Sequence, residues 1–155
     1  MISDGHKGIQ KAVEKSFLGA SWQMCHVHFI RAVLRNVAKK YHKEIADKIK
    51  IALEDETKMQ ELTMDLESRG YSKSADTIEH FLFSLWNYRS FPRTHWRRIR
   101  TTNGLERINK ELKRRTRVVG AFPSDQSFMR LGVSILIDIN EEWLTTKKYL
   151  SMDTD

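Results

Sequence analysis

The stretch from Thr101 to Pro123 constrains the fold of this chain more than any other. Leu105, Ile108 and Leu112 recur at intervals of three and four residues, so they form one apolar stripe along a helix. The chain has two prolines, Pro92 before this stretch and Pro123 at its end, and each interrupts the helical pattern. The sequence thus predicts a helix that packs by one side and is strongly basic elsewhere.

Glu106 lies off the apolar stripe, and Asn109, Lys110 and Lys113 follow it at helical spacings that place them on its face. A carboxylate beside cations could serve a site that handles phosphate. Two alternatives stay open. Asn103 followed by Glu106 fits a capping box, and a carboxylate in the first turn also suits the helix dipole. The basic run can equally be a solvated helix face.

The density of cations favours a polyanionic partner. Lys and Arg number 27 against 20 Asp and Glu, a net charge of +7, which indicates nucleic acid before a membrane surface. Arginine suits bidentate contacts with phosphate, so we expect salt-dependent binding to the DNA or RNA backbone. The cations of this region are Arg93, Arg97, Arg98, Arg100, Arg107, Lys110, Lys113, Arg114, Arg115 and Arg117.

Other features exclude several classes of protein. A single Cys excludes an internal disulfide framework and suits a reducing compartment. No apolar run approaches the roughly 20 residues that span a bilayer, and residues 1–4 lack a signal pattern. The sequence contains no Ser-His-Asp elbow, phosphate-binding glycine loop or dinucleotide fingerprint. We therefore expect a soluble cytoplasmic protein without a membrane partner.

The start of the chain is typical of a piece of an α/β unit: a strand end at Met1–Ile2, a helix over His6–Leu18 and a strand over Ala20–His26. Asp4 then falls where a strand ends, the edge at which active sites of α/β sheets gather. A carboxylate there can ligate Mg²⁺. The alternative is that Asp4 is a turn or N-cap residue.

The rest of the chain has helical periodicity, so the predicted fold is mainly α with a small α/β remnant. Residues 93–100 are predicted to be a linker after the Phe91-Pro92 break. The last helix should turn Phe128, Leu131, Ile135, Ile139 and Trp143 inward. The predicted helices cover 29–41, 43–55, 57–68, 74–85, about 103–117 and 125–149.

Cys25 and His28 have a spacing seen in zinc sites. A closed zinc site needs four ligands, and no second Cys exists here, so structural zinc is not expected. Trp22, Cys25 and Phe29 fit a hydrophobic core better.

Four separated motifs resemble the bacterial insertion-sequence transposases of the Mutator type, in that family's order and over nearly the whole chain. Glu142-Trp143 and Tyr149-Leu150 add to the likeness. The four motifs are SDGHKGI at 3–9, WQMCHVHF at 22–29, TTNGLERIN at 101–109, and KRRTRVVG at 113–120 followed by Phe122-Pro123.

The resemblance implies a ribonuclease-H-like core whose Asp-Asp-Glu triad binds two divalent metals, Mg²⁺ or Mn²⁺. Asp4 matches the second Asp and Glu106 the Glu, with a mainly helical insertion between them. Cys25 and His28 match the family's Cys-x-x-His signature, which supports the site or the fold. Asn103 and Asn109 flank the Glu in the family's pattern, and the basic residues Arg107, Lys110, Lys113, Arg114, Arg115 and Arg117 would hold transposon-end DNA.

The implied activity is DNA strand cleavage and strand transfer by a homo-oligomer. The family's first Asp lies on an earlier strand, so this chain is expected to be the C-terminal part of a transposase and inactive alone. The expected division is a core remnant at 1–30, a helical insertion at 31–92 and the Glu-bearing part at 93–155. The alternative function is a non-catalytic module that binds DNA or an intact transposase and modulates transposition.

Overall fold

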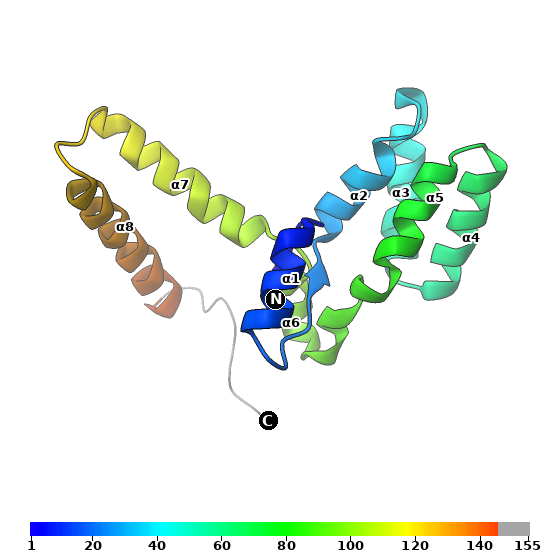
Figure 1. Ribbon diagram of the computed structural model, residues 1–155, viewed down its shortest axis with the longest axis horizontal. Helices are drawn as coiled ribbons and strands as arrows, with labels where there is room; N and C mark the ends of the chain where they lie inside the picture. The colour runs from blue at the N-terminus through cyan, green and yellow to red at the C-terminus, as the bar shows by residue number, and fades with distance from the viewer. Residues whose placement is uncertain (146–155) are drawn as a thin grey trace. The chain divides into compact units, whose positions relative to one another are not determined.

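The computed structural model describes residues 1–145 of a chain that forms two compact units, Met1–Thr102 and Asn103–Asp155 (Figure 1). The first unit contains β1 (Ile2–Ser3), α1 (Lys7–Ser16), β2 (Gln23–Met24), α2 (His26–Leu34), η1 (Lys39–Tyr41), α3 (His42–Ala52), α4 (Glu56–Ser68), α5 (Ser72–Phe81), η2 (Leu82–Ser84), η3 (Asn87–Ser90) and α6 (Arg93–Ile99), where η marks a short 3₁₀ turn. The second contains α7 (Asn103–Val119) and α8 (Asp125–Thr145). The prediction of a mainly helical protein with a small sheet is confirmed.

The sheet consists of β1 and β2, which run parallel with Ile2 opposite Gln23 and Ser3 opposite Met24. α1 is the crossover between them, as a parallel pair requires. The predicted order of strand end, helix and strand is therefore confirmed. The predicted extension of the second strand to His26 is wrong. The Cys25 amide still donates to the Ser3 carbonyl at 2.9 Å, but α2 begins at the next residue, His26, and ends the strand.

α2, α3, α4 and α5 form the hydrophobic core of the first unit. α3 packs on α2 and α4, and α5 packs on α4 and α2. Each of these helices turns an apolar stripe toward the core, which is what makes such short helices stable. The fully buried side chains include Phe29, Val33, Ile45, Ile49, Met59, Leu66, Ile78 and Leu85.

The helical segment, residues 26–84, leaves the sheet after β2, and the residues that follow it are hydrogen-bonded to β2 again. The buried Gln23 side chain donates to the carbonyl of Leu85 at 2.9 Å and accepts from the amide of Tyr88 at 3.0 Å. The Asn87 side chain donates to the carbonyl of Trp22 at 2.6 Å. Residues more than 60 positions apart in the chain are thus hydrogen-bonded at β2.

Residues 93–100 were predicted to be a linker, and that prediction is wrong because α6 occupies Arg93–Ile99. Pro92 stands at its N-cap position, where the missing N–H removes no helical hydrogen bond. Trp96 secures the helix by donating from Nε1 to the carbonyl of Phe91 at 2.7 Å and by packing edge-on against Tyr88. The same proline that interrupts one pattern starts the next helix.

α7 and α8 pack against each other as a helical hairpin in the second unit. The loop between them contains Gly120 in the left-handed conformation, at φ 75°. Ser124 and Ser127 then cap α8 reciprocally, each hydroxyl accepting from the other residue's amide at 3.2–3.3 Å. The rings of Phe122 and Phe128 meet edge-on at 5.2 Å.

The interface between α7 and α8 contains most of the apolar residues that were predicted to face inward. Ile135 is buried, and Ile108, Leu112, Leu131, Ile139 and Trp143 are half-buried. Leu105 and Phe128 are 58% and 46% exposed, so their predicted inward position is wrong; Leu105 lies at the end of α7 farthest from the loop. The expected end of α8 near residue 149 lies outside the described residues. Within the described part of the chain, no helix has the length and apolar character needed to cross a bilayer.

Candidate metal and nucleic-acid site

Asp4 follows β1 directly and is exposed. Its Oδ1 accepts from the amide of His6 at 3.3 Å, which is a turn contact of the kind expected if Asp4 is a turn residue. His6, not Asp4, is the N-cap of α1. Gly5 lies so close to Phe81 that a Cβ atom would stand 2.6 Å from ring carbon Cζ. The turn that presents Asp4 is therefore pressed against the helical core of the same unit.

Cys25 follows β2 as Asp4 follows β1, and it is completely buried. Its Sγ accepts from the amide of Thr102 at 3.4 Å and lies 3.5 Å from the Thr102 hydroxyl oxygen. Burial works to raise the pKa of the Cys25 thiol, but contacts with Thr102 and then with His28 outweigh it, so the pKa is lowered. His28 lies half-buried in α2, three residues further on.

α7 gathers the predicted phosphate-handling residues on one face. Glu106 is in its first turn and is exposed, and Asn103 is the first residue of the helix rather than the residue before it. An open depression of about 800 Å³ runs along this face. Its lining residues are Glu106, Asn109, Lys110, Lys113, Arg114, Arg117 and Val118. A carboxylate and four cations are thus displayed together.

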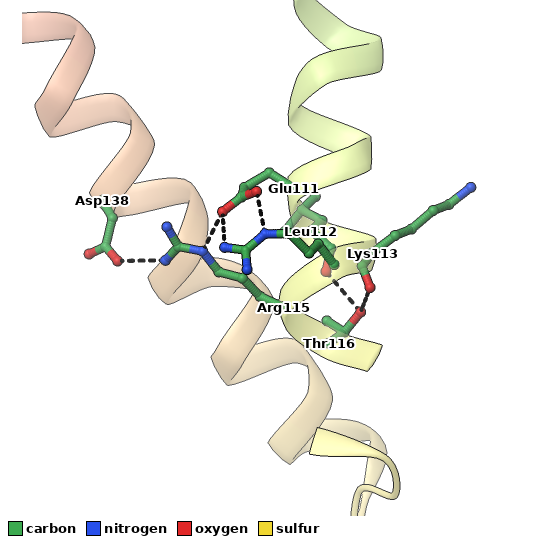
Figure 2. Close-up of polar contacts among 7 residues, drawn as sticks. Glu111, Leu112, Lys113, Arg115, Thr116 and Asp138 are labelled. Atoms are coloured by element: carbon green, nitrogen blue, oxygen red, sulfur yellow. Dashed lines mark hydrogen bonds and ion pairs between the residues drawn. The ribbon is translucent and has the colours of Figure 1, made fainter. Parts of the chain in front are cut away.

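Two of the predicted DNA-binding residues lie apart from this lining. Arg107 is exposed on another part of the helix surface. Arg115 reaches toward α8 instead: Figure 2 shows its guanidinium between Glu111 and Asp138, while Lys113 points away from α8. Arg115 donates to Glu111 at 2.8 Å and to Asp138 at 3.5 Å. Arg115 therefore links the two helices of the hairpin.

Glu111 is the centre of that network. Arg114 binds it through two hydrogen bonds, of 2.9 Å and 2.7 Å, and Arg115 adds a third. Hydrogen bonds from Arg114 and then Arg115 lower the pKa of the Glu111 carboxyl to about 2. Sequence reasoning did not include Glu111 or Asp138 among the site residues. The signal for Glu111 was its spacing of three and four residues from the two arginines.

Asp4 and Glu106 have the chemistry that Mg²⁺ or Mn²⁺ requires, because carboxylate oxygens are hard ligands. Within residues 1–145, no group of three or more His, Cys, Asp or Glu side chains is placed to hold a metal ion. These two carboxylates fit such a metal by type, and the described residues do not on their own form a complete ligand set.

Comparison with known proteins gives consistent matches. A family model described as "Transposase, Mutator family" matches residues 1–146. The transposase of insertion sequence IS256 in transposon Tn4001 of Staphylococcus aureus is 32% identical, over 99% of this chain and 41% of that protein. The IS406 transposase of Burkholderia multivorans is 33% identical, over 99% of this chain and 41% of its own length.

A third relative, the ISRM5 transposase of Rhizobium meliloti, is 30% identical over 99% of this chain and 40% of its own length. No solved structure matches the chain. The chain thus spans about 40% of the length of these relatives. Because the family model covers almost all of its residues, the chain belongs to the Mutator family of transposases.

Proposed function

We propose that this chain supplies part of the active site and part of the DNA-binding surface of a transposase that cleaves and transfers DNA strands with Mg²⁺ or Mn²⁺. The observation that carries the proposal is the face of α7, where Glu106 shares one depression with Lys110, Lys113 and Arg117 in a member of a transposase family. Carboxylate and cations on one face suit a metal-bound phosphate and its neighbours along a strand.

In this proposal Asp4 and Glu106 are the second Asp and the Glu of an Asp-Asp-Glu set. Asp4 supports the assignment by its place after a parallel strand, where active-site residues of α/β sheets gather. Divalent metal, when bound, supplies a Lewis acid that polarises phosphoryl oxygens and activates a hydroxyl nucleophile. The contribution of Asp4 and Glu106 is their carboxylate oxygens, which serve as ligands.

The proposed division of the chain follows from the same assignment. Residues 1–30 belong to a ribonuclease-H-like core, residues 31–92 are a helical insertion, and residues 93–155 carry Glu106. The parallel β1–α1–β2 unit supports the first part, and the return of the chain to β2 at Tyr88 supports the second.

Lys110, Lys113 and Arg117 are assigned the main contacts with the DNA backbone, because they are exposed and line the depression. Arg114 lines it too but shares its guanidinium with Glu111. Arg115 is assigned to the hairpin, since its partners are Glu111 and Asp138. We therefore expect the first three residues to dominate the salt dependence of DNA binding.

The test combines binding and cleavage in one set of variants of the full product of the gene that encodes these residues. Changing Lys110, Lys113 and Arg117 together to Gln should weaken binding to a DNA duplex and flatten its salt dependence, by about 0.9 in slope for each phosphate that is no longer bound. Glu106→Gln should bind DNA as the wild type does yet fail to nick it with Mg²⁺. Fluorescence anisotropy and a strand-nicking assay measure the two effects.

The matched control changes three exposed lysines of the first unit, Lys39, Lys43 and Lys73, to Gln, which removes the same charge. An equal loss of affinity in the control would mean that net charge, not the α7 face, binds DNA. Undiminished nicking by Glu106→Gln would overturn its assignment as a metal ligand.

The second candidate function is a module that binds DNA or an intact transposase without catalysis. It is favoured by one observation, that the exposed side chains of Lys110, Lys113 and Arg117 line one depression and can bind a DNA backbone without metal chemistry. The purified chain of 155 residues would then inhibit transposition when added to an active relative, and the Lys110, Lys113 and Arg117 triple variant would not.

A further inference from the structure

Cys25 is hydrogen-bonded on two sides to segments that lie far apart in the chain. Its amide donates to the carbonyl of Ser3 at 2.9 Å, and its Sγ accepts from the amide of Thr102 at 3.4 Å. Ser3 is the residue before Asp4, and Thr102 is the residue before α7, whose first turn carries Glu106. One buried residue therefore touches the segments that lead to both proposed carboxylates.

The neighbouring residue strengthens this link. The amide of His26 donates to the carbonyl of Arg100 at 3.0 Å, so two of the three residues that precede α7 are tied to the start of α2. The His26 side chain is itself buried and lies 2.9 Å from the carbonyl of Leu85. Thr102 is 9% exposed, so its amide depends on partners within the protein.

We propose that Cys25 is a positioning residue for strand cleavage, which fixes the point at which α7 leaves the first unit with respect to the end of β1. The inference rests on the proposed function for its link to catalysis. Cys25 acts through Thr102 and Ser3 and is not assigned any contact with DNA or metal.

Sulfur suits this position for physical reasons. A fully buried site favours a small apolar side chain, and the thiol packs as one while still accepting a weak, long hydrogen bond. Serine has a shorter bond to its hydroxyl oxygen, so Cys25→Ser should keep part of the contact with Thr102. Cys25→Val is somewhat larger and provides no acceptor, so it should abolish the contact altogether.

The experiment uses the full product of the gene, with Cys25→Ser and Cys25→Val, and follows two quantities. Hydrogen exchange of the Thr102 amide should accelerate about fivefold or more in Cys25→Val, as expected for the loss of one hydrogen bond, and less in Cys25→Ser. Mg²⁺-dependent nicking should slow about tenfold or more in Cys25→Val, because small misplacements of reacting groups have large effects on rate. DNA affinity should not change.

Val33→Ala is the matched control, since Val33 is fully buried in α2, the helix that Cys25 precedes, but its side chain takes no part in these hydrogen bonds. It should destabilise the protein without accelerating Thr102 exchange relative to other amides of the first unit. Partial recovery of nicking in Cys25→Ser, compared with Cys25→Val, is the result that a purely structural role would not give.

Two outcomes would overturn the inference. Unchanged exchange at Thr102 in Cys25→Val would show that the contact does not hold this segment. Faster exchange with full nicking would show that the contact does not serve the reaction. If the wild-type protein does not nick DNA at all, the proposed function fails, while the exchange measurements still decide whether Cys25 anchors the start of α7.

Discussion

Gly5 is the residue on which the turn at Asp4 most directly depends. A Cβ atom there would stand 2.6 Å from Cζ and 3.1 Å from Cε1 of Phe81, so this ring, which packs against Trp22 and Phe29, would have to shift. We expect Gly5→Ala to lower the free energy of unfolding by about 1–3 kcal/mol, the usual effect of overpacking. Urea unfolding followed by circular dichroism measures it.

Gly132 provides the control for this substitution. It lies within α8, and nothing stands within 4 Å of the Cβ that an alanine would add. Gly132→Ala should stabilise the helix by up to about 1 kcal/mol, because alanine has the higher helix propensity. Equal destabilisation by both substitutions would contradict the steric origin of the effect at Gly5.

His26 should make the stability of the first unit sensitive to mild acid. Burial lowers the pKa of this imidazole, the contact with the Leu85 carbonyl opposes that shift, and the charges of Arg100 and Arg89 add to it. The folded protein therefore binds a proton less readily than the unfolded chain, whose His pKa is about 6.5. Stability should be fully present above that pH and fall as the pH drops below it.

The measurement is the free energy of unfolding at several values between about pH 5 and pH 7.5, a range that brackets the ordinary His pKa. His26→Gln removes the titrating group and keeps a donor for Leu85, so its unfolding free energy should fall less over this range. Parallel curves for the two proteins would show that His26 is not responsible.

At the scale of single elements, the hydrogen bonds of Glu111 affect both the packing of α7 against α8 and the binding of DNA. Glu111→Gln should loosen the contact of α7 with α8, because Arg115 loses the partner that it shares with Arg114. The same change should strengthen DNA binding at low salt and steepen its salt dependence, since Arg114 is then available to phosphate. Anisotropy titrations at several salt concentrations test this, and weaker binding would contradict it.

Most elements were predictable because they bury a regular stripe. Ile45, Ile49 and Met59, for example, have helical spacing and are fully buried. α6 was not predictable, because Pro92 interrupts the pattern and its position as an N-cap depends on Trp96 and Tyr88 around it. The sequence placed Lys110 and Lys113 on the face of Glu106 but did not separate Arg115 from the other predicted DNA-binding residues, because its partner Asp138 lies on α8.

At the scale of the whole molecule, the two units differ in how much they bury. Among the described residues of the second unit, Ile135 is the one that is buried, whereas α2 to α5 enclose a continuous core. Helices without such a core open readily. We expect amides of α7 and α8 to exchange at least about tenfold faster than those of α3 to α5.

Hydrogen exchange with mass spectrometry of the purified chain tests this difference. Equal protection in both units would mean that the hairpin is stabilised by something other than its own seam.

The candidate site could be foreseen only in part. Asp4 and Glu106 were singled out by their places at a strand end and on a basic helix, their catalytic roles came from the resemblance to the family, and those roles stay predictions. The contact between Cys25 and Thr102 could not be predicted, because 77 residues separate them and no periodic pattern links them. Long-range hydrogen bonds of this kind depend on the complete packing of the unit.

The closure of the helical segment on β2 has a consequence for how such proteins can vary. The side-chain hydrogen bonds of Gln23 and Asn87 hold the two ends of the helical segment next to each other. The number of residues between these ends therefore does not determine the geometry at β2. We expect α3 and α4 to tolerate changes in length better than α5, because Phe81 of α5 packs against the Gly5 turn that follows β1. The part of the segment between α2 and α5 is therefore a natural location for insertions.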